Sequence, residues 1–212
     1  MRTIVLASSL LALAAPSWST MLVSQYVFQN GVDPVPNTFV VPHLSSSGIS
    51  HTGITLVGND SLFFSGNDWP VGSFGGAYFE VTLTPDPDYL IDFSTVEFHY
   101  VVGSNETYTT GLFSSVDGYT TNLGDHIDPI GIQTWDDSLA VLGVQSSAVT
   151  FRLYGFVDAN TGQSGLYAGN ASFFADSDPM VFTGVPEPGT LGMLAGGALL
   201  LACRRGMKSL AS

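Results

Sequence analysis

The chain has 212 residues, which is enough for one domain of ordinary size together with short terminal segments. Residues 20–184 contain 17 of the 18 carboxylates and only one of the five basic side chains, so this segment has a formal charge of −16. An acidic surface of this kind repels phosphate backbones, so we expect no nucleic-acid partner. The single cysteine, Cys203, lies near the C-terminus, and residues 20–184 therefore depend on an apolar core rather than a disulfide.

The first 19 residues have the three parts of a secretory signal peptide. Arg2 is followed by an apolar run over residues 4–15 and then by Ser17 and Ser19, which are small enough to precede a cleavage before Thr20. A basic start, an apolar run of about a dozen residues and a small-residue exit are typical of such signals. We therefore predict a signal-peptide helix over residues 1–19, removed by signal peptidase. The alternative is a buried N-terminal helix.

Between residues 20 and 184, short runs of alternating apolar and polar residues are separated by Gly, Asn, Asp and Pro. Period-two alternation is typical of half-buried antiparallel strands, and no segment of ten or more residues has a helical period. The segment therefore predicts one all-β domain, an antiparallel β-sandwich or jelly roll. Strands are expected at residues 21–28, 54–58, 61–66, 77–84, 94–102, 107–115, 138–144, 148–156, 167–174 and 180–183.

Two of these strands show clearly which side chains should face the core. The predicted inward sets are Phe79, Val81 and Leu83 in "AYFEVTLT", and Val96, Phe98, Tyr100 and Val102 in "STVEFHYVV". Asp117-Gly118 has the composition of a tight turn. These features favour a core between two sheets, with polar side chains on the outer faces.

Residues 185–212 form a separate C-terminal segment. Fourteen of them, residues 190–203, carry no charge. As a helix they would reach about 21 Å, against about 30 Å for the hydrocarbon core of a bilayer. We predict a short transmembrane helix, with Arg204 and Arg205 on the cytoplasmic side.

The triplet Pro186-Glu187-Pro188 precedes this apolar run. The two prolines remove two backbone donors and bias the preceding residues to extended geometry. We therefore expect the triplet to join neither a helix nor a sheet and to be open to a protease. Glu187 is the only charge between Asp178 and Arg204, which makes it the ionic group that a receptor could recognise there.

The tail "VPEPGTLGMLAGGALLLACRR" resembles that of PEP-CTERM exported proteins, in which a Pro-Glu-Pro motif, a short transmembrane stretch and an arginine cluster follow in this order. The resemblance implies export from a Gram-negative bacterium, a membrane-anchored precursor, and an exosortase that removes the tail. It also implies a place on the cell surface or in the extracellular matrix, associated with exopolysaccharide and biofilm. "LFSSVDGYTTNLG" and "VTFRLYGF" are similar to segments of β-sandwich domains in the same class, which have no assigned chemistry.

Three residues of the middle segment are candidates for ligand binding. Arg152 is its only basic residue, and it can act as a clamp for carboxylates or sugar hydroxyls; the alternative is an ion pair with a nearby aspartate. Trp69 and Trp135 lie among polar residues and can stack on sugar rings. The alternative for both is packing in the core, because tryptophan is usually mostly buried.

Catalytic and metal chemistry have weaker support. Glu80 and Glu97 can be considered as an acid and base pair of the glycosidase kind, although solvated outer faces explain both. Asp125 and Asp128 in "GDHIDP" could help to hold a cation, but a solvated loop is the simpler interpretation. His43, His51, His99 and His126 lack the spacing of metal ligands, no Gly-x-Ser-x-Gly motif occurs, and the cysteine is in the tail.

Two classes of function therefore remain open. The first is a non-catalytic surface or matrix protein without a cofactor. The second is a carbohydrate-binding or carbohydrate-active β-sandwich that uses Trp69, Trp135 or the pair Glu80 and Glu97.

Overall fold

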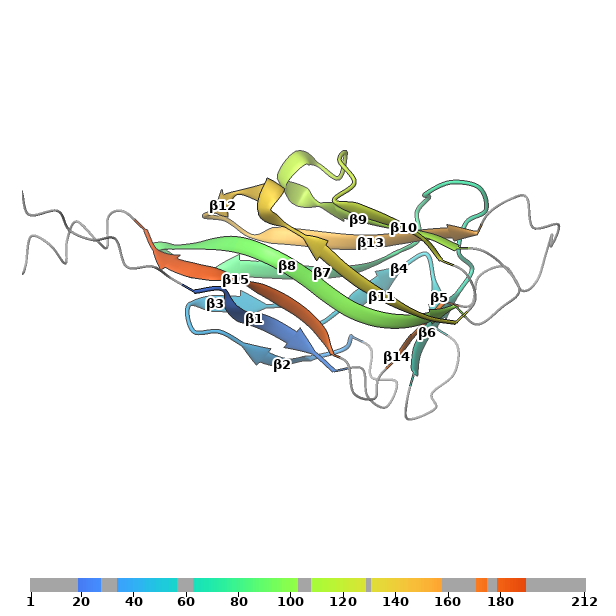
Figure 1. The fold of residues 1–212 in the computed structure, drawn as a ribbon, viewed down its shortest axis with the longest axis horizontal. Coiled ribbons are helices and arrows are strands. Elements are labelled where there is room, and N and C mark those ends of the chain that lie inside the picture. The colour runs from blue at the N-terminus through green and yellow to red at the C-terminus, as the bar shows by residue number, and fades with distance from the viewer. Residues whose placement is uncertain are drawn as a thin grey trace, which may run out of the picture.

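A computed structural model describes residues 19–27, 34–56, 63–102, 108–128, 131–157, 171–174 and 179–189. In these ranges the chain forms two antiparallel β-sheets and two short 3-10 helices (Figure 1), which confirms the predicted all-β class. Within the same ranges there is no helix long and apolar enough to cross a bilayer. The predicted signal peptide, except Ser19, and the predicted transmembrane helix lie outside the described residues.

The larger sheet has nine strands and is organised around β8 (Tyr89–Val102), which has neighbours on both edges. Val96 of β8 pairs with Phe182 of β15 on one edge and with Asp137 of β11 on the other. The sheet continues from β15 through β1 to β2, and from β14 through β6 to β5. The other eight strands are β1 (Met21–Tyr26), β2 (Asn37–Val40), β5 (Thr55–Leu56), β6 (Phe63–Asn67), β11 (Gly131–Ser138), β12 (Val144–Gln145), β14 (Ala171–Phe174) and β15 (Met180–Pro188).

The smaller sheet has six strands, in the order β10-β9-β13-β7-β3, and β4 also pairs with β7. Its centre is β13, which is hydrogen-bonded to β9 on one edge and to β7 on the other. The strands are β3 (Leu44–Ser46), β4 (Ser50–Thr52), β7 (Tyr78–Pro85), β9 (Tyr108–Ser114), β10 (Gly124–Asp128) and β13 (Val149–Val157). The 3-10 helices are η1 (Ser115–Asp117) and η2 (Ala140–Leu142).

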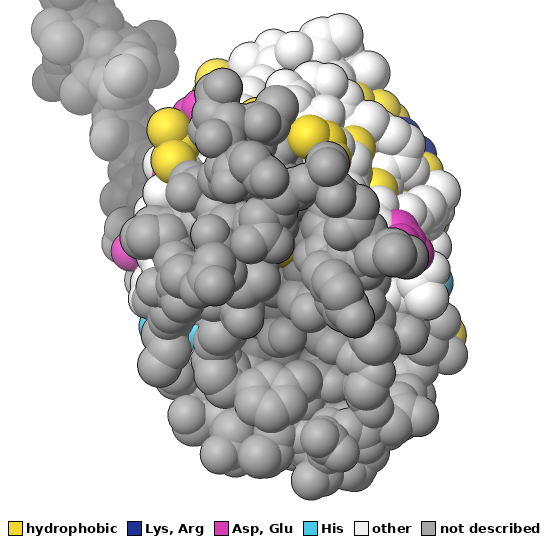
Figure 2. All heavy atoms as spheres, turned by 90° about the vertical axis from the view of Figure 1, so that its right-hand side faces the viewer, with side chains coloured by type: hydrophobic (Ala, Val, Ile, Leu, Met, Phe, Trp, Pro, Cys, Tyr) yellow, Lys and Arg dark blue, Asp and Glu magenta, His cyan; other side chains and the backbone are white. Residues whose placement is uncertain are grey.

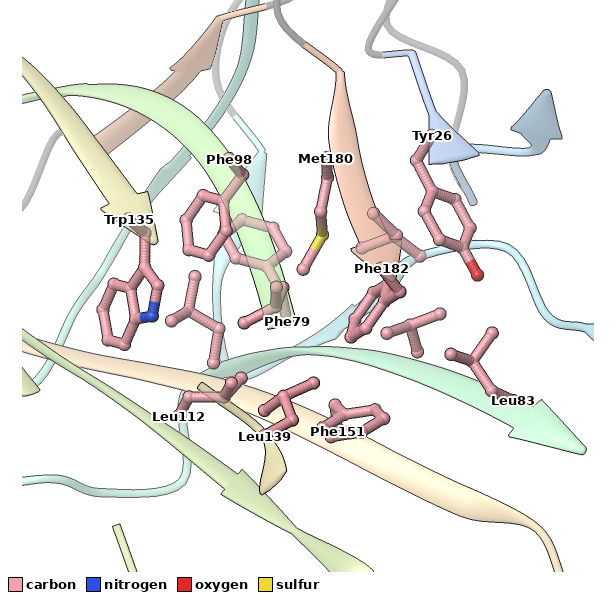
Figure 3. Packing of buried hydrophobic residues seen from close by; sticks show 14 of the residues in the cluster. Tyr26, Phe79, Leu83, Phe98, Leu112, Trp135, Leu139, Phe151, Met180 and Phe182 are labelled. Atoms are coloured by element: carbon pink, nitrogen blue, oxygen red, sulfur yellow. The ribbon is translucent and has the colours of Figure 1, made fainter. Parts of the chain in front are cut away.

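The two sheets pack face to face around one apolar core (Figure 3). The ring of Phe151 on β13 lies 5.3 Å from that of Phe93 on β8 and 5.0 Å from that of Phe182 on β15, measured between centroids. The hydroxyls of Tyr26 and Ser46 also join the sheets through a hydrogen bond. The predicted inward side chains that the structure describes are all buried: Phe79, Val81, Leu83, Val96, Phe98 and Tyr100.

A void inside the core is too small for a ligand. The void has a volume of about 20 Å³ and is lined by apolar side chains that include Phe79, Leu112 and Phe151. Such a volume holds about one water molecule. This void is therefore not a ligand-binding site.

The expectation that the Pro-Glu-Pro triplet joins no sheet is wrong. β15 runs to Pro188, and its last residues pair with the start of β8, Pro186 with Ile91 and Pro188 with Tyr89. β1 pairs with β15 only as far as Gly184, so the end of β15 has one edge without a described partner strand. The missing N–H groups of the prolines can face this open edge, where they interrupt no ladder.

The strand expected at residues 138–144 is also wrong. β11 ends at Ser138, the η2 turn follows, and β12 begins at Val144. Leu139 is fully buried and its N–H donates to the carbonyl of Ser94 at 2.8 Å, while Val141 projects into solvent. One anchored leucine therefore fixes the segment as a turn, although its composition is that of a strand.

Candidate functional site

The outer face of the six-stranded sheet presents a group of aromatic and charged side chains. β7 and β13 pair so that Arg152 lies opposite Glu80 and Tyr154 lies opposite Tyr78. Side chains alternate along a strand, and the residues between these positions enter the core, so these four point away from it. Opposite residues on one face are close enough to interact directly. Strand register alone thus places an ion pair next to two tyrosines.

Arg152 and Glu80 form a short, partly shielded ion pair. Arg152 Nε donates to Glu80 Oε2 at 2.6 Å, and Arg152 Nη1 lies 3.5 Å from the hydroxyl of Tyr154. The two side chains are 24% and 29% exposed. Burial lowers the pKa of Arg152, but the hydrogen bonds to Glu80 and Tyr154 outweigh it and raise the pKa overall. The ion pair predicted for Arg152 is present, with a glutamate as its partner instead of an aspartate.

A turn between β9 and β10 brings a third tyrosine to this pair. The carboxylate of Asp117 accepts hydrogen bonds from the backbone N–H groups of Thr120, at 3.2 Å, and Thr121, at 2.7 Å. Side-chain hydrogen bonding from Thr121 and Thr120, together with these backbone bonds, stabilises the ionised form and lowers the pKa of Asp117 to about 2. Within the turn, Gly118 and Tyr119 both adopt the left-handed conformation, with φ of 73° and 63°.

The left-handed conformation of Tyr119 places its ring against the guanidinium of Arg152. Its ring centroid lies 3.9 Å from Arg152 Cζ, and the ring of Tyr78 lies 4.3 Å from the same atom. A positive φ costs a residue with a side chain about 1–2 kcal/mol. The turn therefore holds Tyr119 in an unfavourable backbone conformation that places its ring against the guanidinium. We call Tyr78, Glu80, Tyr119, Arg152 and Tyr154 the tyrosine platform.

Three phenylalanines extend the platform on one side. Phe74 lies 4.9 Å from Phe156 and 5.5 Å from Phe113, ring centroid to ring centroid, and Phe113 lies 5.3 Å from Tyr154. A side chain at Gly111 would place its Cβ 2.6 Å from the Phe74 ring, so the glycine makes room for it. All of these rings are half-buried. The outer face is thus aromatic where an ordinary solvated face would be polar.

The chemistry of the platform suits a sugar. Aromatic rings offer flat faces that pack against the C–H groups of a pyranose, while Arg152 donates and Glu80 accepts hydrogen bonds. No serine, cysteine or lysine nucleophile belongs to the group, and its single carboxylate is hydrogen-bonded to Arg152. The arrangement can bind and orient a ligand, but it lacks the second carboxylate of a glycosidase.

A groove lies at one end of the sandwich, between the η1 and η2 turns. It has a volume of about 230 Å³, and it is lined by Ser114, Val116, Asp117, Thr121, Leu123, Val141 and Leu142. Its charged group is the carboxylate of Asp117, whose oxygens already accept bonds within the turn. The groove therefore offers a ligand less polar recognition than the platform does.

The two tryptophans considered for sugar stacking are in the core. Trp69 is 4% exposed and packs edge-on against Phe79 at 5.6 Å. Trp135 is 0% exposed and stacks on Phe98 at 5.4 Å, with its ring nitrogen inside the cluster (Figure 3). That nitrogen has no hydrogen-bond partner among the residues that the structure describes. Buried in this way, neither indole offers a face to a ligand, and the burial fits the core-packing alternative.

Glu80 and Glu97 are not a catalytic pair. Glu80 lies on the outer face of the six-stranded sheet, whereas Glu97 is exposed on the outer face of the nine-stranded sheet, on the other side of the core. Near Glu97, His99 Nε2 lies 3.7 Å from Glu97 Oε1. Two carboxylates on opposite faces cannot flank one glycosidic bond, so this hydrolase hypothesis is wrong.

The segment "GDHIDP" is mostly a strand and not the expected loop, because β10 covers Gly124–Asp128. His126 on this strand contacts Asp137 of β11 at 2.8 Å, and its ring packs at a tilt against Trp135 at 4.2 Å, so it joins the edges of the two sheets. The described ranges contain no group of three or more side chains suited to a metal ion. Figure 2 shows one end of the molecule, where the described acidic side chains lie apart from one another.

The sorting residues are placed only in part. Pro186, Glu187 and Pro188 end β15, and Gly189 N–H donates to the carbonyl of Asp88 at 2.6 Å. Arg204 and Arg205 lie outside the described residues.

Sequence reasoning identified Arg152 but missed the tyrosines around it. Tyr78 and Tyr154 occupy the outward positions of strands whose inward positions were assigned correctly, so counting outward aromatics would have found them. The Asp-Gly turn pointed to a tight bend next to Tyr119. Its contact with a strand more than thirty residues away could not be seen in the sequence.

Comparison with known proteins gives limited information. No family model matches the chain, and no curated protein matches it. Among solved structures, it is similar to the K1 cleaved adhesin domain of Lys-gingipain from Porphyromonas gingivalis W83, with 11% identity, a TM-score of 0.36, and coverage of 77% of this chain and 97% of that one.

Two further structures show weaker likeness. For the enzymatically active domain of bacteriophage CBA120 tailspike protein 4 the identity is 15%, the TM-score 0.33, and the coverage 76% of this chain and 21% of that one. For the family 11 carbohydrate-binding module of the Clostridium thermocellum cellulase Lic26A-Cel5E the identity is 12% and the TM-score 0.26. The match covers 79% of this chain and 94% of that one. At such scores the likenesses carry no conclusion about activity or ligand.

Proposed function

We propose that this protein is an exported, non-catalytic surface protein whose β-sandwich binds polysaccharide on the tyrosine platform. The observation that carries the proposal is the contact of the Arg152 guanidinium with the rings of Tyr78 and Tyr119, beside Glu80 on an outer sheet face. It combines flat aromatic surface with a fixed donor and a fixed acceptor. These are the two kinds of contact that a sugar ring needs.

The rigidity of the platform favours binding over a purely structural role. Arg152, Glu80 and Tyr154 are held on strands, and Tyr119 is held by the Asp117 turn against the cost of its backbone conformation. Side chains fixed in advance lose little conformational freedom when a ligand arrives. Arg152 uses two of its N–H groups in the hydrogen bonds to Glu80 and Tyr154, and its remaining donors have no partner among the described residues.

Export and sorting are the second part of the proposal. The signal peptide over residues 1–19 directs the chain through the cytoplasmic membrane of a Gram-negative bacterium, where signal peptidase removes it. The tail then anchors the precursor until an exosortase, which recognises the Pro-Glu-Pro motif, releases the protein to the cell surface or matrix. Because Pro186 and Pro188 pair with β8, recognition requires the end of β15 to detach, whereas cleavage after Gly189 leaves the sheet intact.

The binding proposal is tested by co-sedimentation of the full-length chain with insoluble extracellular polysaccharide from the host. Tyr119→Ala should weaken binding about tenfold, since one stacked aromatic contributes about 0.5–1.5 kcal/mol beyond its buried area. Phe39→Ala is the matched control, because Phe39 is an aromatic side chain, 39% exposed, on β2 of the other sheet. Equal binding by both variants and the unaltered chain would reject the platform as the site.

The sorting proposal is tested by the intact mass of the protein recovered from its host. The surface species should lack residues 1–19 and also Arg204 and Arg205. Glu187→Ala should leave the unprocessed precursor in the membrane fraction, whereas Glu97→Ala, which removes an equal charge from an exposed strand position, should be processed normally. A surface species with both arginines would contradict processing.

A further inference from the structure

We infer that the platform selects a neutral polysaccharide and rejects acidic ones, an inference that rests on the proposed function. The reason lies in the charge of the site and its surroundings. Arg152 is the only basic residue in residues 20–184, and its guanidinium is already paired with Glu80 at 2.6 Å. The Arg152–Glu80 pair therefore has no net charge, although it contains a cation.

An acidic sugar would have to share the guanidinium with Glu80, whose negative charge already offsets that of Arg152. The Arg152 side chain is fixed by a hydrogen bond at Nε and by tyrosine rings at 3.9 Å and 4.3 Å, so it cannot turn toward a second carboxylate without losing these contacts. A carboxylate ligand accepts hydrogen bonds but donates none, and Glu80 is also only an acceptor. Placing the two side by side adds a repulsion that the single positive charge of Arg152, already paired with Glu80, offsets only in part.

The surface around the platform is negatively charged, as an acidic polysaccharide is. Residues 20–184 have a formal charge of −16, and Asp117 of the turn that carries Tyr119 stays ionised because its pKa is lowered to about 2. Repulsion from such a surface reduces the rate at which an anionic polymer approaches, most strongly at low ionic strength.

A neutral sugar meets complementary groups instead. Its hydroxyls can donate to Glu80 and accept from Arg152, and its C–H face can pack against Tyr78, Tyr119 or Tyr154. On β4, which pairs with β7, Ser50 and Thr52 lie opposite Glu80 and Tyr78 and add hydroxyl groups to the same face. Because no net charge takes part, binding of a neutral polymer should depend little on salt.

The test is affinity electrophoresis of the full-length chain in native gels, since a protein of net charge −13 migrates readily. The gels contain hydroxyethyl cellulose or galactomannan as neutral probes, or alginate or polygalacturonate as acidic probes, each at low and at physiological salt. We expect retardation by at least one neutral probe, little changed by salt, and none by the acidic probes.

Glu80→Gln makes the test specific. It frees the charge of Arg152 while it keeps the shape of the side chain, so the variant should gain retardation by alginate, with at least about a tenfold higher affinity than the unaltered chain. Glu97→Gln changes the net charge equally on the other sheet and should gain none. Urea unfolding midpoints are measured for both variants, as a control that they remain folded.

The outcomes separate the two proposals. Retardation by alginate that equals or exceeds that by the neutral probes would overturn the selectivity while leaving polysaccharide binding in place. A Glu80→Gln chain that does not gain alginate binding would also overturn the selectivity. Retardation by none of the four probes, or retardation unaffected by Tyr119→Ala, would count against the proposed binding site itself.

Discussion

Replacing Tyr119 by Gly and by Ala separates the stability of the platform from its binding. Both substitutions remove the ring that lies 3.9 Å from Arg152 Cζ, and with it a cation–π contact that stabilises an exposed site by about 0.5–1 kcal/mol. They differ in the backbone, because φ at this position is +63°. Ala keeps the cost of about 1–2 kcal/mol for a left-handed residue with a side chain, whereas Gly does not.

The expected difference follows from these values. Gly gains freedom in the unfolded chain, which opposes folding by about 0.5–1 kcal/mol. The Gly variant should therefore be more stable than the Ala variant by about 0.5–1 kcal/mol, and close in stability to the unaltered chain. In a protein of this size 1 kcal/mol corresponds to about 2–4 °C in Tm. Polysaccharide binding should nevertheless weaken equally in both variants, because both lack the ring.

The measurement is urea unfolding of the full-length chains, followed by far-UV circular dichroism, with equal m-values required before midpoints are compared. Binding is measured on the same samples by co-sedimentation. An Ala variant as stable as the Gly variant would refute the strained conformation of Tyr119. Loss of binding in proportion to stability, instead of equal loss in both, would refute a direct contact between the ring and the ligand.

Three further predictions concern the fold. Phe151→Ala, in the centre of the core, should cost about 3–5 kcal/mol of the free energy of unfolding, whereas Phe39→Ala should cost under about 1 kcal/mol; similar urea midpoints would contradict the packing. The pKa of Asp117 is lowered to about 2, so its contribution to stability is complete above the unfolded pKa of about 4 and is lost as the pH falls toward 2; Asp117→Asn should reduce that loss in acid titrations followed by circular dichroism. Deleting residues 185–212 should lower the free energy of unfolding by about 1–2 kcal/mol more than deleting 190–212, because only the longer deletion removes the pairing of β15 with the start of β8; equal urea midpoints would show that this pairing adds nothing.

The sequence by itself determined the class of the fold and the orientation of its clearest strands. The alternation in "AYFEVTLT" and "STVEFHYVV" assigned Phe79 and Phe98 to the core, because a side-chain period of two leaves only two faces to choose between. It also indicated an ion pair for Arg152, since a lone cation among many carboxylates finds a partner. Local pattern suffices for such features, because neighbouring residues alone decide them.

Tertiary structure decided which residues meet. Glu80 became the partner of Arg152 because β7 and β13 pair in a register that no local pattern specifies, and Glu97 was separated from it because the chain crosses to the other sheet. The triplet around Glu187 joined β15 because β8 is long enough to pair with it and β1 is not. Trp135 entered the core because its strand covers one edge of β8. These outcomes depend on pairing and packing between segments far apart in the chain, and the free energy of such contacts exists only once the sheets have formed.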